Sequence, residues 1–207
     1  CPTMITADLM HQMNPDGQLE PAQAYAYLLA TICDLDVVNS EYDYKLMADY
    51  FLPAVQQMSV EQFVDNPYYR NLHFPEVHSE DWEFRWVKYQ PYEAFLCDDI
   101  ALLPDYREIP AVGSFDREVA YPMVLQNEQE WMAVKPSEIA TMQTALNKVS
   151  GEVFTFGLGL GYFTYMASQK PEVSSITVVE QDAQVINLFN QYLLSQFPEK
   201  QKVKIIQ

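Results

Sequence analysis

The sequence predicts an α/β fold that begins with helices, continues through a small antiparallel β layer and ends in alternating strands and helices. Residues up to about 73 contain helix-forming runs, and residues 82–86 alternate aromatic and other side chains at the period of a strand. Residues 153–206 alternate short apolar runs with helical ones, as chains with parallel strands do. We therefore expect a helical region at residues 1–76, a small β region at 77–134 and an α/β region at 135–207.

The helical region is predicted from composition and from the spacing of its apolar residues. Residues 22–35 are rich in Ala and Leu, which favour helix. Residues 41–51 place Tyr, Met and Phe on one helical face, and Pro53 is expected to interrupt that helix because proline lacks an N–H. Ser59 and Gln62 have the spacing of a capping box, so a further short helix is expected there.

The β region is predicted from an aromatic stripe. Trp82, Phe84 and Trp86 share one side of a strand, because successive side chains point to opposite faces. We interpret the stripe as the buried face of a sheet, and stacking on a planar ligand is the alternative. Further strands are expected at residues 118–125 and 130–134. The expected loops contain Pro104, Pro110 and Gly113.

The α/β region is predicted to alternate helices with parallel strands. A helix from Pro136 to about Val149 buries one apolar stripe, and Gly151 follows its end, where a positive φ is common. The order that follows is strand 153–156, a glycine loop, helix 162–169, strand 175–179, helix 182–197 and strand 203–206. This order indicates parallel strands joined by crossover helices.

The run VFTFGLGLGYF carries the clearest functional pattern. A strand leads into Gly157, Gly159 and Gly161, and glycines suit a turn whose backbone a ligand approaches closely. Glu180 ends the next strand, so its carboxylate faces the same crevice and can accept hydrogen bonds from ribose hydroxyls. A dinucleotide site would need a third glycine where Tyr162 stands. The alternative interpretation is a tight strand–helix turn with a capping Glu.

This G-x-G-x-G loop resembles motif I of class I S-adenosylmethionine (SAM)-dependent methyltransferases, and the run VVEQD resembles their acidic motif. The resemblance implies a Rossmann-like SAM-binding domain at residues 135–207. In such domains the loop packs against the methionine part of SAM, and the acidic residue holds the ribose. The resemblance assigns cofactor contacts to Gly157, Gly159, Gly161 and Glu180, with Leu158 and Tyr162 as neighbours.

A narrower resemblance is to spermidine synthases and related uncharacterised methyltransferase-like proteins. The run VVEQDAQVI resembles their V-E-x-D-x-x-V-I run, and they also place a small β domain before the nucleotide-binding domain. Their preceding helix carries a Y-H-E-M run, and in this sequence Ser137 stands where the histidine would be. Glu138 therefore either faces the ligand or favours the helix N-terminus through its charge.

The resemblance extends from residue 136 to Gln207, the last residue of the sequence. A domain of this class normally has seven strands, and the sequence ends after the third predicted one. We therefore expect only the first half of the domain here, without the residues that meet the adenine and the substrate. The edge of the third strand is expected to pair with a missing segment or with a second chain, as in a homo-oligomer.

Net charge, apolar runs and cysteine spacing limit the kinds of molecule and the cellular location expected for the chain. The formal charge is −17, from 29 acidic and 12 basic residues, which disfavours nucleic acid and anionic membranes. Such a surface is neutral or favourable toward cationic small molecules, and solubility alone is the simpler interpretation. Without an apolar run of membrane-spanning length or a signal peptide, a cytoplasmic location is expected. Cys1, Cys33 and Cys97 are widely spaced, so neither a zinc site nor a disulfide framework is expected.

Two other patterns are interpreted as structural. The run NPYY at residues 66–69 is similar to the N-P-P-Y motif of amino-group methyltransferases, but the second proline is missing and the run lies far before the glycine loop. We interpret it as a turn with aromatic anchors. His11, His73 and His78 have no carboxylate at metal-ligand spacing, so they are expected on the surface or in loops.

The leading prediction is a SAM-dependent methyltransferase that acts on a small molecule. SAM brings its own leaving group, so the protein mainly binds and aligns the reactants, and no catalytic base can be named. The first alternative is an aminopropyl transferase of the spermidine synthase type, which uses decarboxylated SAM. The second is a non-catalytic SAM-fold module for binding or assembly. A dehydrogenase is disfavoured by Tyr162.

Overall fold

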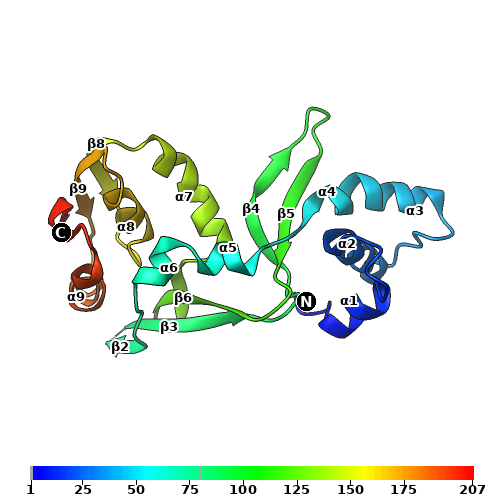
Figure 1. The fold of residues 1–207 in the computed structure, drawn as a ribbon, viewed down its shortest axis with the longest axis horizontal. Helices are drawn as coiled ribbons and strands as arrows, with labels where there is room; N and C mark the ends of the chain where they lie inside the picture. The colour runs from blue at the N-terminus through cyan, green and yellow to red at the C-terminus, as the bar shows by residue number, and fades with distance from the viewer. Residues whose placement is uncertain (1, 80) are drawn as a thin grey trace. The chain divides into compact units, whose positions relative to one another are not determined.

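The computed structural model describes residues 2–79 and 81–207 and has a mixed α/β structure with helices and several sheets (Figure 1). The chain divides into two units. The first comprises residues up to Phe63 together with Lys88–Val119, and the second comprises Val64–Val87 together with Ala120–Gln207. No helix among the described residues has the length and apolar content to cross a membrane.

The first unit begins with helices. Pro21 opens one of them in its first turn, and a capping box between Glu20 and Gln23 holds that start. Its buried face includes Tyr25 and Leu28, which pack in the core of this unit. The helices are α1 (Ala7–Met13), α2 (Pro21–Ile32), α3 (Glu41–Leu46), the π-helix η1 (Met47–Phe51), α4 (Leu52–Ala54) and α5 (Val60–Val64), the last crossing into the second unit.

The helix runs past its expected end at Phe51, through η1 and α4, and stops at Ala54, one residue after Pro53. A π-turn precedes the proline, in which the Leu52 N–H donates to the Met47 carbonyl. Proline leaves the carbonyl four residues earlier, that of Asp49, without its usual donor. Arg107 supplies a donor instead, since its Nη1 lies 3.0 Å from the Asp49 carbonyl oxygen.

A sheet that the sequence did not predict completes the first unit. Strand β5 (Glu108–Ser114) lies between β1 (Val55–Gln57), to which it is parallel, and β4 (Phe95–Leu102), to which it is antiparallel. Pro110 and Gly113 were expected in loops, but both lie within β5. Pro110 sits where the β4–β5 register is irregular, a place where a missing N–H is tolerated. Gly113 permits close packing, because a Cβ there would lie 2.9 Å from the Cβ of Cys97.

The predicted aromatic stripe lies on a four-stranded sheet in which β2 and β3, and β6 and β7, pair antiparallel. Trp82 and Phe84 are buried and Trp86 is partly buried, which confirms the interpretation as a buried sheet face. Asn127 and Glu128 join two strands of this sheet with positive φ at both residues, as tight hairpin turns require. The strands, in sheet order, are β2 (Val77–Ser79), β3 (Trp82–Tyr89), β6 (Val119–Gln126) and β7 (Gln129–Ala133).

The second unit also contains the predicted alternation of strands and helices. The strand order is β10-β9-β8, and both pairings are parallel, as predicted. The last helix is shorter than expected: it ends at Tyr192, and Leu194–Gln196 follow as the 3-10 helix η2. The elements are α7 (Pro136–Lys148), β8 (Gly151–Phe156), α8 (Tyr162–Ser168), β9 (Val173–Val179), α9 (Ala183–Tyr192) and β10 (Val203–Ile206), with the short helix α6 (Pro67–Asn71) in the same unit.

The core of the second unit forms around β9. Ile176 and Val178 of this strand are fully buried, as is Phe189 of α9, and all three belong to one apolar cluster. Strand β8 differs, because Phe154 and Phe156 are 59% and 76% exposed. One side of β8 is therefore left open in the part of the chain that the structure describes.

The two units differ from the three regions expected at residues 1–76, 77–134 and 135–207. The strands β4 and β5 belong with the N-terminal helices, whereas α6 and the stripe strand β3, up to Val87, belong with the α/β region. Local pattern indicates the type of each element but not its packing partners. Cys33 is exposed, Cys97 is buried, and both are free thiols; Cys1 lies outside the described residues.

Candidate functional site

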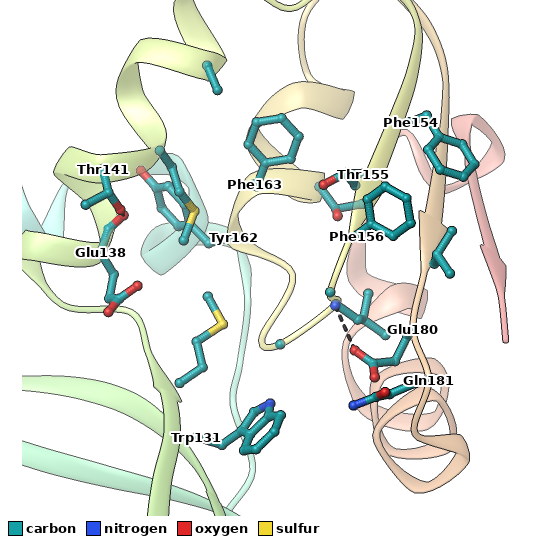
Figure 2. Close-up of a pocket in the computed structure, with 18 residues that line it drawn as sticks. Trp131, Glu138, Thr141, Phe154, Thr155, Phe156, Tyr162, Phe163, Glu180 and Gln181 are labelled. Atoms are coloured by element: carbon teal, nitrogen blue, oxygen red, sulfur yellow. Dashed lines mark hydrogen bonds between the residues drawn. The ribbon is translucent and has the colours of Figure 1, made fainter.

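A pocket of about 940 Å³ lies in the second unit, beside the glycine loop (Figure 2). Its walls come from β7, α7, β8, the loop, α8 and the end of β9. Five of the six residues predicted to contact the cofactor line it: Gly157, Leu158, Gly159, Tyr162 and Glu180. Gly161 does not line the pocket but lies at the N-terminal end of α8.

The three loop glycines all have positive φ, with values of +80° at Gly157, +50° at Gly159 and +73° at Gly161. Their surroundings differ. A Cβ at Gly161 would overlap the buried ring of Phe189, and one at Gly159 would overlap the sulfur of Met132. A Cβ at Gly157 would meet no described atom within 4 Å. Gly157 is therefore the glycine whose bare backbone is open to the pocket.

Hydrogen bonds fix the backbone of the loop. The Gly157 N–H donates to the Val179 carbonyl at 2.8 Å, which ties the loop to the end of β9. The Gly161 N–H donates to the Leu158 carbonyl at 2.8 Å and closes a tight turn. Between them, the Gly159 N–H donates to no described residue. Among the backbone N–H groups of residues 157–161, that of Gly159 is therefore the one without a partner in the described part of the chain.

Glu180 is joined directly to the loop. Its side chain is 8% exposed, and its Oε2 accepts a hydrogen bond of 2.9 Å from the Leu158 N–H, drawn as the dashed line in Figure 2. Its Oε1 accepts a 2.9 Å bond from the Asp182 N–H. A carboxylate has about four acceptor sites, so each oxygen keeps one site after these bonds. The carboxylate is thus held in one orientation and can still accept two ligand hydroxyls.

Asp182 extends the hydrogen bonds of Glu180 to the start of helix α9. Its Oδ1 accepts hydrogen bonds from the Gln184 and Val185 N–H groups at 2.8 and 3.2 Å, which caps α9. The end of β9, Glu180 and the start of α9 are therefore linked through consecutive short hydrogen bonds.

Leu158 and Tyr162 line the pocket but are almost fully buried, at 3% and 1% exposed. Both belong to the core cluster of the second unit. The Tyr162 hydroxyl accepts a 2.8 Å hydrogen bond from Nδ2 of Asn66. Burial raises the pKa of Tyr162, and the bond from Asn66 partly offsets this. Tyr162 is therefore neutral at physiological pH and presents a ring to the pocket.

Glu138 lies in the first turn of α7 and also lines the pocket, where Figure 2 shows it opposite Glu180. Its position fits both interpretations, a carboxylate that faces a ligand and a charge that stabilises the helix N-terminus. Its half-buried carboxylate has no hydrogen bond or ion pair with any described residue. Thr141, one turn later, lines the same wall.

The pocket is acidic and aromatic. Its lining includes the carboxylates of Glu138 and Glu180 and no Lys, Arg or His. Such a surface is unfavourable to phosphate groups, and aromatic faces attract cations. Among residues 2–79 and 81–207, no cluster of His, Cys, Asp and Glu is arranged to hold a metal ion. The aromatic lining comes from Trp131, Phe154, Phe156, Tyr162 and Phe163.

Sequence reasoning missed several lining residues. Trp131 and Met132 lie on β7, which the sequence placed only in a β layer. The Leu160 N–H lies 3.4 Å from the Met132 sulfur, a contact that no local pattern indicates. Phe154 and Phe156 had a signal, since they alternate on a strand that leads into the glycine loop.

The remaining sequence candidates lie outside the pocket. Asn66 caps α6, and Tyr68 is buried within it, which fits the interpretation as a turn with aromatic anchors. His11, His73 and His78 are all exposed, as expected.

Comparison of the chain with models of known protein families, with curated proteins and with solved structures finds no match.

Proposed function

We propose that the chain binds SAM through the glycine loop and Glu180 and serves a SAM-dependent methyltransferase reaction on a small molecule. One observation carries the proposal: the Glu180 carboxylate is bonded to the Leu158 N–H of the loop at the wall of the pocket. This bond holds a ribose acceptor next to a glycine turn that is open to a ligand. These are the two features that the resemblance to class I methyltransferases assigns to the cofactor.

The topology supports a Rossmann-like assignment for this region. Parallel strands in the order β10-β9-β8 follow the order of the first half of a Rossmann-like sheet. In such sheets the ligand lies at the carboxyl ends of the strands. The loop follows β8 and Glu180 follows β9, so both occupy that edge.

The residues of the pocket fit SAM in charge and shape. SAM supplies a methyl group on a positively charged sulfur, which is itself the leaving group. In the proposed complex Gly157 lets the ligand approach the backbone, the Gly159 N–H donates to it, and Glu180 accepts from its ribose. The aromatic walls exclude water and favour a cation.

One observation favours decarboxylated SAM and aminopropyl transfer as a second candidate. SAM carries a carboxylate, and the pocket lining offers no basic side chain to pair with it. Glu138 instead offers a carboxylate with no described partner, which suits an ammonium group. This difference makes the two ligands distinguishable by affinity.

Isothermal titration of the purified chain with SAM, decarboxylated SAM and NAD tests the proposal. We expect binding of SAM or decarboxylated SAM and none of NAD, whose pyrophosphate meets the acidic lining. In the Glu180→Ala variant we expect the affinity to fall by about 1–3 kcal/mol. Preference for decarboxylated SAM would select the second candidate. NAD binding, or no binding by either SAM compound, would contradict the proposal.

A further inference from the structure

The segment Asn66–Asn71 contacts the glycine loop and the helix after it, although it lies about ninety residues earlier in the chain. It forms α6 with Asn66 as its N-cap. The segment lies outside the pocket lining and outside residues 136–207, over which the chain resembles a SAM-binding domain. Its contacts nevertheless reach the backbone that would receive the ligand.

Tyr68 holds the loop from its buried side. The residue is fully buried, and its hydroxyl donates a 2.6 Å hydrogen bond to the Leu160 carbonyl, between Gly159 and Gly161. Its ring also packs edge-on against that of Tyr162, with centroids 5.1 Å apart. Leu160 is fully buried as well, so its carbonyl would have no access to water without Tyr68. Burial raises the pKa of Tyr68 well above its usual value, which keeps the donor protonated.

Asn66 holds the residue that follows the loop. Its Oδ1 accepts a 3.0 Å bond from the Tyr68 N–H, and its Nδ2 donates a 2.8 Å bond to the Tyr162 hydroxyl. These two bonds use opposite ends of the amide and therefore fix its orientation. Asn66 thus links the start of α6 to the first residue of α8.

We propose that Asn66 and Tyr68 are positioning residues that hold the glycine loop in its ligand-binding conformation. Glu180 fixes the Leu158 N–H, and Tyr68 fixes the Leu160 carbonyl. Gly159, with its unpaired N–H, is held between these two points. The identity of the ligand rests on the proposed function, whereas the holding of the loop does not.

The chain offers a control in the same segment. Asn71 donates a 2.8 Å bond from Nδ2 to the Tyr165 hydroxyl, one turn further along α8. Tyr165→Phe removes this bond, and Tyr68→Phe removes the bond to the loop. Both variants keep their rings in the core, so both are expected to fold.

The test compares Tyr68→Phe, Tyr165→Phe and the wild type by amide hydrogen exchange without ligand and by titration with SAM and decarboxylated SAM. We expect Tyr68→Phe to speed exchange across residues 158–162 roughly three- to tenfold and to weaken ligand binding by a similar factor. We expect Tyr165→Phe to change neither the exchange of residues 158–162 nor the affinity for the ligand. Asn66→Ser keeps a capping oxygen but lacks the amide donor, and it should give the same loop response as Tyr68→Phe.

Equal exchange of residues 158–162 in Tyr68→Phe, Tyr165→Phe and the wild type would overturn the inference. Faster loop exchange with unchanged ligand affinity would overturn the link to binding. If the wild type binds neither SAM compound, the proposed function fails. The exchange comparison then decides by itself whether Tyr68 holds the loop.

Discussion

At the scale of single residues, the three loop glycines are required for different reasons. Gly161 makes room for the Phe189 ring, and Gly159 makes room for the Met132 side chain. Only Gly157 combines a positive φ with open space on the side of the pocket. The motif therefore contains two glycines that make room for packed side chains and one, Gly157, whose backbone is open to the pocket.

We expect Gly161→Ala and Gly157→Ala to differ in both stability and binding. Both substitutions carry the strain of a left-handed residue, about 1–2 kcal/mol. Gly161→Ala adds a clash with a buried ring, so it should lower the free energy of unfolding by about 1–3 kcal/mol more than Gly157→Ala. Urea unfolding followed by tryptophan fluorescence measures this difference. Equal losses would contradict the assignment of Gly161 to packing.

Gly157→Ala is expected to act mainly on the ligand. Its methyl group would enter the pocket at the place where the backbone is bare. We expect a loss of SAM affinity of at least about 1.4 kcal/mol, which is tenfold. Titration that finds unchanged affinity would show that the ligand does not approach Gly157.

Tyr25 makes the stability of the first unit depend on alkaline pH. Burial, with the charge of Glu93, raises the pKa of Tyr25 from 10.0 to about 12, and its hydroxyl donates to the Tyr92 carbonyl at 3.0 Å. The pKa of Tyr25 is higher in the folded state than in the unfolded state. The contribution of the protonated Tyr25 to the free energy of unfolding is therefore complete below pH 10 and is lost as pH rises through 12. The loss should be about 2–3 kcal/mol.

Urea unfolding followed by circular dichroism, below pH 10 and near pH 12, checks this dependence. The Tyr25→Phe variant should lose less stability over this interval than the wild type. Tyr42→Phe, which removes a hydroxyl from a side chain that is 71% exposed, is the control. The same pH dependence in Tyr25→Phe and the wild type would contradict the role of Tyr25.

At this scale the sequence indicated some site residues and missed others. Glu180 was predictable because its place at a strand end fixes the direction of its side chain relative to the loop. Trp131 and Met132 were not, because their approach to the loop depends on how β7 packs against the α/β region. Tyr68 was identified as an anchor, but nothing local indicates that its partner is Leu160.

At the scale of elements, the end of β9 and the start of α9 have separable roles. The Asp182 side chain caps the helix, whereas its backbone N–H holds Glu180. An alanine at this position keeps the N–H and loses the cap.

We therefore expect Asp182→Ala to lower the free energy of unfolding by about 1 kcal/mol and to leave SAM affinity unchanged. Glu180→Ala is the matched comparison, since it should lower the affinity. Urea unfolding measures the stability of both variants, and titration measures their affinity for SAM. A large affinity loss in Asp182→Ala would show that the cap itself belongs to the ligand site.

Element types followed from periodicity where the chain was regular. Strands β8, β9 and β10 and helices α7 and α8 lie close to their predicted positions. The expected helix end before Pro53 and the expected loop at Pro110 differ from the structure, because tertiary features accommodate both prolines. Arg107 satisfies the carbonyl that Pro53 leaves unpaired, and an irregular register accommodates Pro110. Neither compensation can be read from the neighbouring sequence.

At the scale of the whole molecule, the two units have separate apolar cores. The expected region boundaries did not reveal this, because β4 and β5 join helices that are distant in sequence. The tryptophans Trp82, Trp86 and Trp131 all lie in the second unit. Tryptophan fluorescence therefore reports on that unit, whereas circular dichroism reports on both.

We expect the urea unfolding curves from fluorescence and from far-ultraviolet circular dichroism to have different midpoints, because each unit has its own core. Adding a ligand of the pocket should shift the fluorescence curve by more than the dichroism curve. Superimposable curves would show that the units unfold as one cooperative structure.

Amide hydrogen exchange with and without saturating SAM shows whether the glycine loop and Glu180 form one ligand site. We expect SAM to slow exchange at residues 157–162 and 180–182, with little change in the first unit. Protection confined to other segments, or no protection at any SAM concentration, would contradict such a site.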